Sequence, residues 1–200
     1  MASLQSRIKR PFQDVAVSDD NEVDTAQFLD AAEGVVMLFD ILESKAFYPV
    51  KTDMTTNIEK VRTKHAKDPA AFSTLQKIIL DDVRIKDRTA TQGLLWLKRG
   101  LEFTAMGLEM NMGTPAAELS ESFTKAYEVT LQKYHGFVVR NMFGLAMKVC
   151  PTRKSFYEKI GGGEDEATVI AQLREWAEAL QKLLNLLNKF YAAGAYDKGL

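Results

Sequence analysis

The sequence predicts an all-α protein of about eight helices in one domain. Apolar residues recur in steps of three and four along most of the chain, as they do on the buried face of a helix. No segment shows the alternation of apolar and polar residues that is typical of a strand, and no internal repeat stands out. The 200 residues are 46% apolar and 26% charged, which is the composition of a globular domain with a substantial core.

The individual elements follow from apolar stripes and from the residues that begin and end helices. Residues 1–23 carry a basic and an acidic cluster on either side of Pro11, and we expect an irregular arm there, followed by a single domain at 24–200. Proline in a first turn suits a helix start, and it marks three of the expected helices. The expected helices lie at about 24–42, from Pro49 to 67, from Asp68-Pro69 to 83, at 89–110, from Pro115 to 131, from His135 to 146, before Gly161, and at 165–192.

Charge, hydropathy and cysteine content bound the function. The 26 basic and 27 acidic residues give a net charge of −1, which offers no general electrostatic case for nucleic acid. No apolar run approaches the roughly 18 residues that span a bilayer, and the N-terminus lacks the apolar core of a signal peptide. A lone Cys150 cannot form an intramolecular disulfide, which fits a reducing compartment. We expect a cytoplasmic monomer whose membrane contact is peripheral.

The sequence offers little chemistry of the kind that catalysis needs. Two scattered histidines and one cysteine do not make a metal-ligand pattern, and the Gly161–Gly163 run lacks the Lys-Ser/Thr of a phosphate loop. Asp53 with His135 could form an acid–base pair, but no positioned nucleophile accompanies them. We therefore expect no metal, no cofactor and no catalytic residue, and we favour binding over catalysis.

Three polar residues converge on one face of the second expected helix. Asp53, Asn57 and Lys60 are spaced four and then three apart, so they fall within about a 60° arc. They offer an acceptor, a carboxamide that donates and accepts, and an ammonium donor, a mixture that suits a neutral ligand with several hydroxyls. The alternative is a solvated helix face with a local Asp–Lys contact.

Glycines repeat every seven residues on the fourth expected helix, at Gly93, Gly100 and Gly107, with Trp96 and Phe103 between them. Each interior glycine costs about 1 kcal/mol relative to alanine, so the stripe indicates that something needs the space above it. That something is either a closely crossing helix or a ligand over the indole of Trp96, which could stack on a sugar ring. His135, at the end of an apolar stripe, is either a satisfied core residue or a ligand group.

These residues carry a resemblance to a known family. The pattern Asp53-x-x-x-Asn57-x-x-Lys60, the run from Gly93 to Gly100 and the segment Lys133-Tyr134-His135-Gly136 resemble the signature of the glycolipid transfer protein family in order and separation. The similarity extends from about Phe28 to the C-terminal helix. The segments 44–54 and 91–96 look closest to the fungal heterokaryon-incompatibility branch.

The resemblance implies a two-layer helical sandwich that encloses a lipid tunnel and binds a glycosphingolipid, such as glucosyl- or galactosylceramide, during transient contact with a membrane. By position, Asp53, Asn57 and Lys60 would bind the first sugar and Trp96 would stack beneath it, while Asp53 and His135 would hold the ceramide amide. The candidates for the remaining roles are Gln92 for an additional headgroup contact, Phe39, Phe103 and Phe143 for the tunnel wall, and Tyr127, Lys133 and Phe137 for membrane docking.

The resemblance also favours an uncharged head. The branch that recognises ceramide-1-phosphate has basic residues at the positions of Asn57, Trp96 and Gly100, and here these positions are neutral. Phe137 stands where animal members have tryptophan, so this position lacks the indole N–H that favours the membrane interface. The alternatives are a ceramide-1-phosphate carrier, a lipid-metabolising enzyme, and a helical adaptor that recruits partners through its long last helix.

Overall fold

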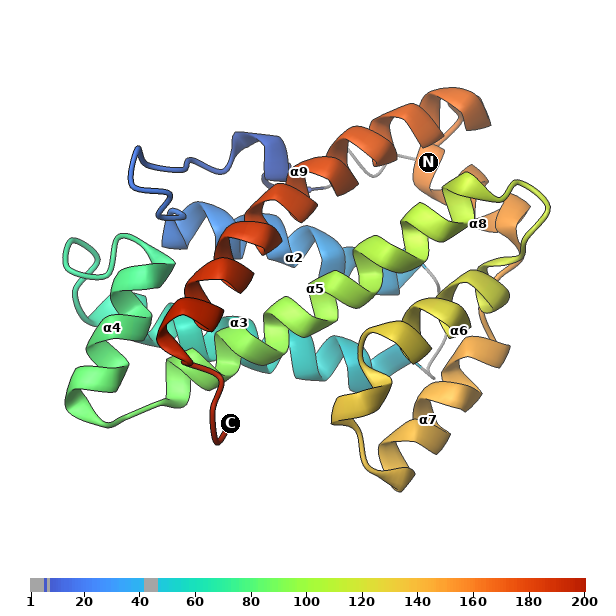
Figure 1. Cartoon of the computed structure of the whole chain (residues 1–200). Helices are drawn as coiled ribbons and strands as arrows, with labels where there is room; N and C mark the ends of the chain where they lie inside the picture. The colour runs from blue at the N-terminus through green and yellow to red at the C-terminus, as the bar shows by residue number, and fades with distance from the viewer. Residues whose placement is uncertain (1–5, 7, 42–46) are drawn as a thin grey trace.

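The computed structural model describes residues 6, 8–41 and 47–200, and in this part of the chain it contains eight α-helices and two short 3-10 helices but no strand (Figure 1). The all-α prediction is confirmed for these residues, within which no helix has the length and apolar character needed to cross a membrane. The elements are η1 (Phe12–Asp14), α2 (Thr25–Ile41), α3 (Tyr48–Lys67), α4 (Leu75–Ile85), α5 (Thr89–Gly113), α6 (Leu119–Val129), η3 (Gln132–Tyr134), α7 (Phe137–Lys148), α8 (Arg153–Gly161) and α9 (Glu166–Gly194).

Helix α5 lies at the centre of the arrangement. In Figure 1 it runs beside α9, with α2 and α3 in the layer behind and with α6 and α7 at one end. Its leucine stripe is buried, including Leu94, Leu97 and Leu101, which have no exposed surface. Because α5 is covered on several sides, it is apolar around most of its circumference, unlike a helix with one solvated face.

Two of the three glycines that repeat every seven residues on α5 allow neighbouring helices to approach closely. A Cβ atom added to Gly93 would lie 3.0 Å from the Cβ of Lys60 on α3, and one added to Gly107 would lie 2.7 Å from the ring of Phe123 on α6. Gly100 is different, because its nearest neighbour would be Met54 at 3.7 Å, an ordinary contact distance. Close crossing of helices therefore explains Gly93 and Gly107 and does not explain Gly100.

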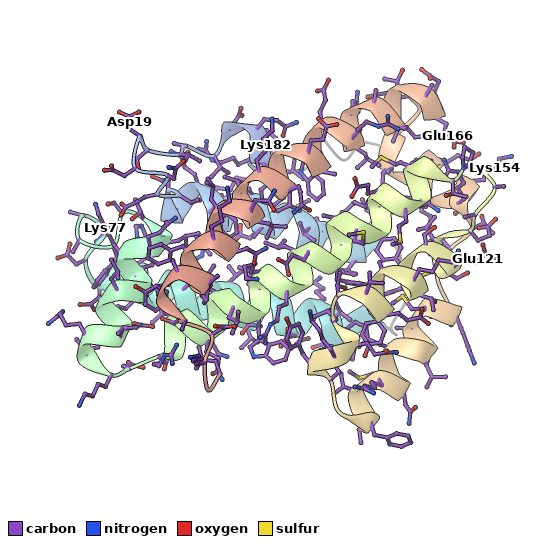
Figure 2. The ribbon with its side chains drawn as sticks, in the orientation of Figure 1. Asp19, Lys77, Glu121, Lys154, Glu166 and Lys182 are labelled. Atoms are coloured by element: carbon purple, nitrogen blue, oxygen red, sulfur yellow. The ribbon has the colours of Figure 1, made fainter. Side chains whose placement is uncertain are left out.

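The arm expected at residues 1–23 packs on the core over its described second half. Phe12 is buried, and its ring centroid lies 5.1 Å from that of Trp176 on α9 and 6.3 Å from that of Phe28 on α2. The charged side chains labelled in Figure 2, such as Lys77 and Lys182, point away from the packed helix faces. The domain boundary between residues 23 and 24 stays a prediction.

Three expected helix starts are wrong by a few residues, whereas the start near Pro49 is close. Helix α4 begins at Leu75, because Thr74 is held extended by a bridge to Asp24 and its hydroxyl caps the amide of Lys77. Helix α6 begins at Leu119, after an N-cap at Glu118, rather than at Pro115. Helix α7 begins at Phe137, because Gly136 is extended, so His135 lies in the connection between η3 and α7.

Candidate functional site

A cavity of about 450 Å³ opens between α3, the N-terminal half of α5, η3 and α7. Its wall combines most of the predicted polar residues with apolar side chains from four elements. The described residues that line it are Pro49, Val50, Asp53, Met54, Asn57, Lys60, Gln92, Trp96, Gly100, Phe103, Leu131, Tyr134, His135, Gly136, Val139, Met142 and Phe143.

The three polar residues of α3 form a hydrogen-bonded row along this wall. Asn57 donates from Nδ2 to Oδ2 of Asp53 over 3.1 Å, and Lys60 donates from Nζ to Oδ1 of Asn57 over 3.2 Å. Asn57 is buried, while Asp53 and Lys60 reach toward solvent on either side of it. The carboxamide is therefore fixed in orientation by its neighbours, and the carboxylate and ammonium keep capacity for a ligand.

The environment of Asp53 disfavours its charge in spite of its position at the rim. Although the residue is exposed, nearby protein atoms displace water from the carboxyl group, and this desolvation raises its pKa above the ordinary value of 3.8. The charge of Lys60 and the hydrogen bond from Asn57 oppose this shift. A ligand that donates hydrogen bonds to the carboxylate would restore some of the lost solvation.

The indole of Trp96 contacts two rings, one from Tyr134 at the end of η3 and one from His135 in the η3–α7 connection. It stacks on the imidazole of His135, with centroids 5.9 Å apart and an interplanar angle of 11°, and it meets Tyr134 edge-on at 6.3 Å. Because Trp96 is only half-buried and Gly100 leaves the adjoining wall open, the indole borders the cavity as a flat, partly apolar surface.

The surroundings of His135 favour the neutral form of its imidazole. Its Nδ1 lies 3.1 Å from the hydroxyl of Tyr127. Burial lowers its pKa from the ordinary value of 6.5, and the positive charges of Arg140 and Arg99 lower it further. A neutral imidazole whose Nδ1 accepts from a tyrosine carries its proton on Nε2, which can then donate to a carbonyl.

Aromatic rings continue from this polar mouth toward the interior. The ring centroid of Phe143 lies 5.0 Å from that of His135, and that of Phe103 lies 6.0 Å from that of Phe143. Both phenylalanines are buried and line the inner part of the cavity. Phe39, the third candidate for a tunnel wall, is also buried but lies outside the described lining of this cavity and packs on Phe47 at 5.8 Å.

Of the three docking candidates, two are on the surface and one is not. Phe137 is 79% exposed and Lys133 is exposed beside it. Tyr127 is 4% exposed, so the expectation that it lies on a docking surface is wrong. The reason is that the apolar stripe of α6 faces α5, which turns Tyr127 inward to stack on Phe143 at 4.7 Å and to reach His135.

Several lining residues were not among the predicted site residues. Tyr134 could have been found, since it lies inside the Lys133–Gly136 segment that carries the resemblance. Met54, Leu131, Val139 and Met142 fit the pattern of ordinary core residues, and only the tertiary arrangement of α3, α5 and α7 brings them to one cavity. Among the described residues, no group of three His, Cys, Asp or Glu side chains could hold a metal ion.

Comparison with known proteins decides the family. The model of the family "Glycolipid transfer protein (GLTP)" matches residues 23–162. The chain belongs to this family. A glycolipid transfer protein of Aureobasidium melanogenum is 42% identical over 186 residues, which cover 93% of this chain and 91% of that protein.

Solved structures agree with this membership of the glycolipid transfer protein family. HET-C2, a fungal glycolipid transfer protein, matches with a TM-score of 0.90 and 42% identity over 95% of this chain and 97% of that chain. FAPP2, which selects simple glycosphingolipids by using the GLTP fold, matches with a TM-score of 0.90 and 30% identity over 98% and 97%. The predicted resemblance to the family and to its fungal branch is confirmed.

Proposed function

We propose that the protein binds neutral glycosphingolipids with simple sugar heads, such as glucosyl- or galactosylceramide, and transfers them between membranes without chemical change. The observation that carries the proposal is the make-up of one cavity. Its mouth holds a hydrogen-bonded polar row and a flat indole, and its inner wall consists of buried aromatic rings. This change from a polar mouth to an apolar interior matches a lipid with a hydroxylated head. The fungal and FAPP2 relatives support the same class of ligand.

In this proposal the polar row recognises the first sugar. Asn57 and Lys60 would hydrogen-bond its hydroxyls, Trp96 would stack on its C–H face, and Gln92, which lines the same wall, would add a contact. Asp53 would accept from both the sugar and the ceramide N–H, and His135 would donate from Nε2 to the ceramide carbonyl. A head that left these polar groups unpaired beneath the bound lipid would bind much less tightly.

The lipid chains would enter past Phe143 and Phe103 and extend toward Phe39 in a tunnel between the helix layers. A cavity of about 450 Å³ holds only part of a ceramide, so binding would separate side chains that are packed in the free protein. Each methylene exposed to water would cost about 0.8 kcal/mol, so the apolar tunnel has to replace the bilayer as the surroundings of the chains.

A phosphorylated head suits this cavity less well. Its described wall carries one lysine, Lys60, which is already hydrogen-bonded to Asn57, and one aspartate, Asp53. A phosphate group needs several donors or cations and would meet the carboxylate of Asp53. We therefore place a ceramide-1-phosphate carrier second. We further propose that the protein acts as a cytoplasmic monomer that touches membranes transiently, through the surface around Phe137 and Lys133.

Transfer of fluorescent glucosylceramide between vesicles tests the proposal. We expect transfer by the wild-type chain, and losses of at least about tenfold for Asp53→Val and Trp96→Ala, because each removes a distinct headgroup contact. Circular dichroism should show unchanged helicity in both variants. Absence of transfer by the wild-type chain would refute the proposal, as would release of free sugar or ceramide, which would indicate an enzyme.

A further inference from the structure

Among the described residues, four cationic side chains are buried, and one of them differs from the others in what it contacts. Three meet carboxylates, as expected for buried charges, since an isolated ion loses much solvation in a protein interior. The ion pairs are Lys64 with Asp81 and Asp82, Lys98 with Glu102, and Arg153 with Glu166.

The fourth, Arg99, meets aromatic rings instead. It is 7% exposed, and its guanidinium carbon lies 3.7 Å from the ring centroid of Tyr134 and 4.8 Å from that of Trp96. Within the described part of the chain, the Arg99 side chain forms neither an ion pair nor a hydrogen bond. A cation at these distances from ring faces is attracted by their π electrons, and a planar guanidinium can also stack on them.

This placement links two separate elements of the cavity wall. Trp96 and Arg99 belong to α5, whereas Tyr134 belongs to η3 and directly precedes His135. The guanidinium therefore joins the indole to the segment that presents the imidazole. Arg99 itself is absent from the described lining of the cavity, whereas both rings that it contacts, those of Trp96 and Tyr134, belong to that lining.

Four residues of α5 lie three or four positions from Trp96 and so neighbour it on the helix surface, namely Gln92, Gly93, Arg99 and Gly100. The two glycines have no side chain that could hold the ring. The guanidinium of Arg99 does contact the indole.

We propose that Arg99 is a positioning residue, which holds the Trp96 indole and the Tyr134–His135 segment in the arrangement that receives a sugar head. The proposal rests on the proposed function for its ligand, whereas the arrangement of the rings can be tested without one. The positive charge of Arg99 also disfavours protonation of His135, and a neutral imidazole donates from one nitrogen only.

The test compares Arg99→Met, Arg99→Lys and the neighbouring Lys98→Met. Affinity for glucosylceramide, the indole N–H NMR signal of Trp96, the pKa of His135 and the Tm are measured for each. The two indole signals are assigned with Trp176→Phe and the imidazole signals with His65→Gln. These four readouts separate the position of the rings from the stability of the fold.

For Arg99→Met we expect about tenfold weaker binding, a shifted Trp96 signal and a higher pKa of His135, with a Tm that is not lowered. The Tm should hold because methionine replaces a buried cation that has no carboxylate partner. Arg99→Lys should keep the pKa of His135 but lose affinity, because an ammonium does not stack as a guanidinium does. Lys98→Met should lower the Tm, since Glu102 and Asn188 lose a partner, and leave affinity and the Trp96 signal unchanged.

An unmoved Trp96 signal in Arg99→Met would overturn the proposal, and so would wild-type affinity. A fall in Tm as large as that of Lys98→Met would also overturn it, because it would indicate an ordinary structural cation. If the wild-type chain binds no glucosylceramide, the proposed function fails, and the Trp96 signal and the pKa of His135 still decide whether Arg99 positions the rings.

Discussion

The hydrogen bond between Tyr127 and His135 shows how a single buried residue can set the chemistry of the cavity. Tyr127 contacts the imidazole through its hydroxyl and stacks on Phe143 through its ring. The hydroxyl selects which nitrogen of the neutral imidazole carries the proton, since Nδ1 must accept when the tyrosine donates. The stacking contact is independent of the hydroxyl, so the two roles can be separated.

Tyr127→Phe removes the hydroxyl and keeps the stack. We expect glucosylceramide affinity to fall about fivefold to tenfold, because a typical hydrogen bond contributes about 1 kcal/mol and His135 becomes free to change tautomer or rotate. Helicity should be unchanged by circular dichroism. The matched control is Tyr157→Phe, which removes a hydroxyl that bonds Asn111 in the α5–α8 contact and should lower the Tm without changing affinity. Wild-type affinity in Tyr127→Phe would show that the hydrogen bond has no part in binding.

The lowered pKa of His135 predicts how stability depends on pH. In the unfolded chain the imidazole regains its ordinary pKa of 6.5, so the unfolded state binds more protons than the folded state as pH falls through that value. The free energy of unfolding should therefore decrease with falling pH, and His135→Gln should reduce this dependence. Urea unfolding at about pH 7.5 and about pH 5.5 measures the difference between the two chains. An identical pH dependence in both would contradict the prediction.

At the scale of helices, periodicity predicted what is buried better than where helices begin. The leucine stripe of α5 and the polar row of α3 follow from spacing alone, because they are properties of one helix. Asp68-Pro69 and Pro115 also have good local start signals, yet α4 and α6 begin several residues later. For α4 the reason is a bridge between Thr74 and Asp24, and a contact between such distant residues leaves no mark on local sequence.

The burial of Tyr127 agrees with its spacing on α6, since Leu119, Phe123 and Tyr127 recur every four residues, whereas its docking role came from the resemblance alone. The spacing does not tell which helix this stripe packs against, and the rotation of α6 against α5 decides that. That rotation depends on Gly107, whose missing side chain lets the Phe123 ring come close to α5. The glycine was visible in the sequence, but its partner was not.

The glycines of α5 predict opposite effects for one kind of substitution. Gly93→Ala should destabilise the fold by about 1–3 kcal/mol, because its methyl group would be forced against Lys60 and the backbone oxygen of Asn57 at 3.2 Å. Gly100→Ala should be neutral or stabilising by up to about 1 kcal/mol, because there is space beside Met54 and alanine favours helix. Chemical unfolding measures the free energy of unfolding of the two variants. Equal changes in this free energy would contradict the close approach of α3 to α5 at Gly93.

At the scale of the whole molecule, an exposed apolar surface adjoins the mouth of the cavity. Phe137, Val138 and Leu145 of α7 are each more than 60% exposed, and Lys133 and Arg140 are exposed near them. This exposed surface is continuous with the cavity, because Gly136 and Val139, which flank Phe137 and Val138, line it. Apolar side chains beside basic ones suit the interface of a bilayer, where rings insert and cations meet anionic heads.

Phe137→Ser should slow glycolipid transfer between vesicles about tenfold, because loss of the ring weakens insertion at the membrane interface. Binding of dispersed glucosylceramide should stay at the wild-type level, since Phe137 points away from the core. Leu80→Ser is the matched control. Leu80 is an exposed apolar residue on α4, which lies at the opposite end of the molecule from α7 (Figure 1), so its loss should leave transfer unchanged.

The comparison of the two serine variants separates membrane contact from lipid binding. If both slowed transfer equally, the effect would come from a general loss of apolar surface, and docking through α7 would be wrong. If Phe137→Ser alone slowed transfer while binding held, extraction of lipid from the bilayer would be the step that depends on this surface. That result would place the cavity mouth against the membrane, since the same short segment presents Phe137 to the outside and His135 to the cavity.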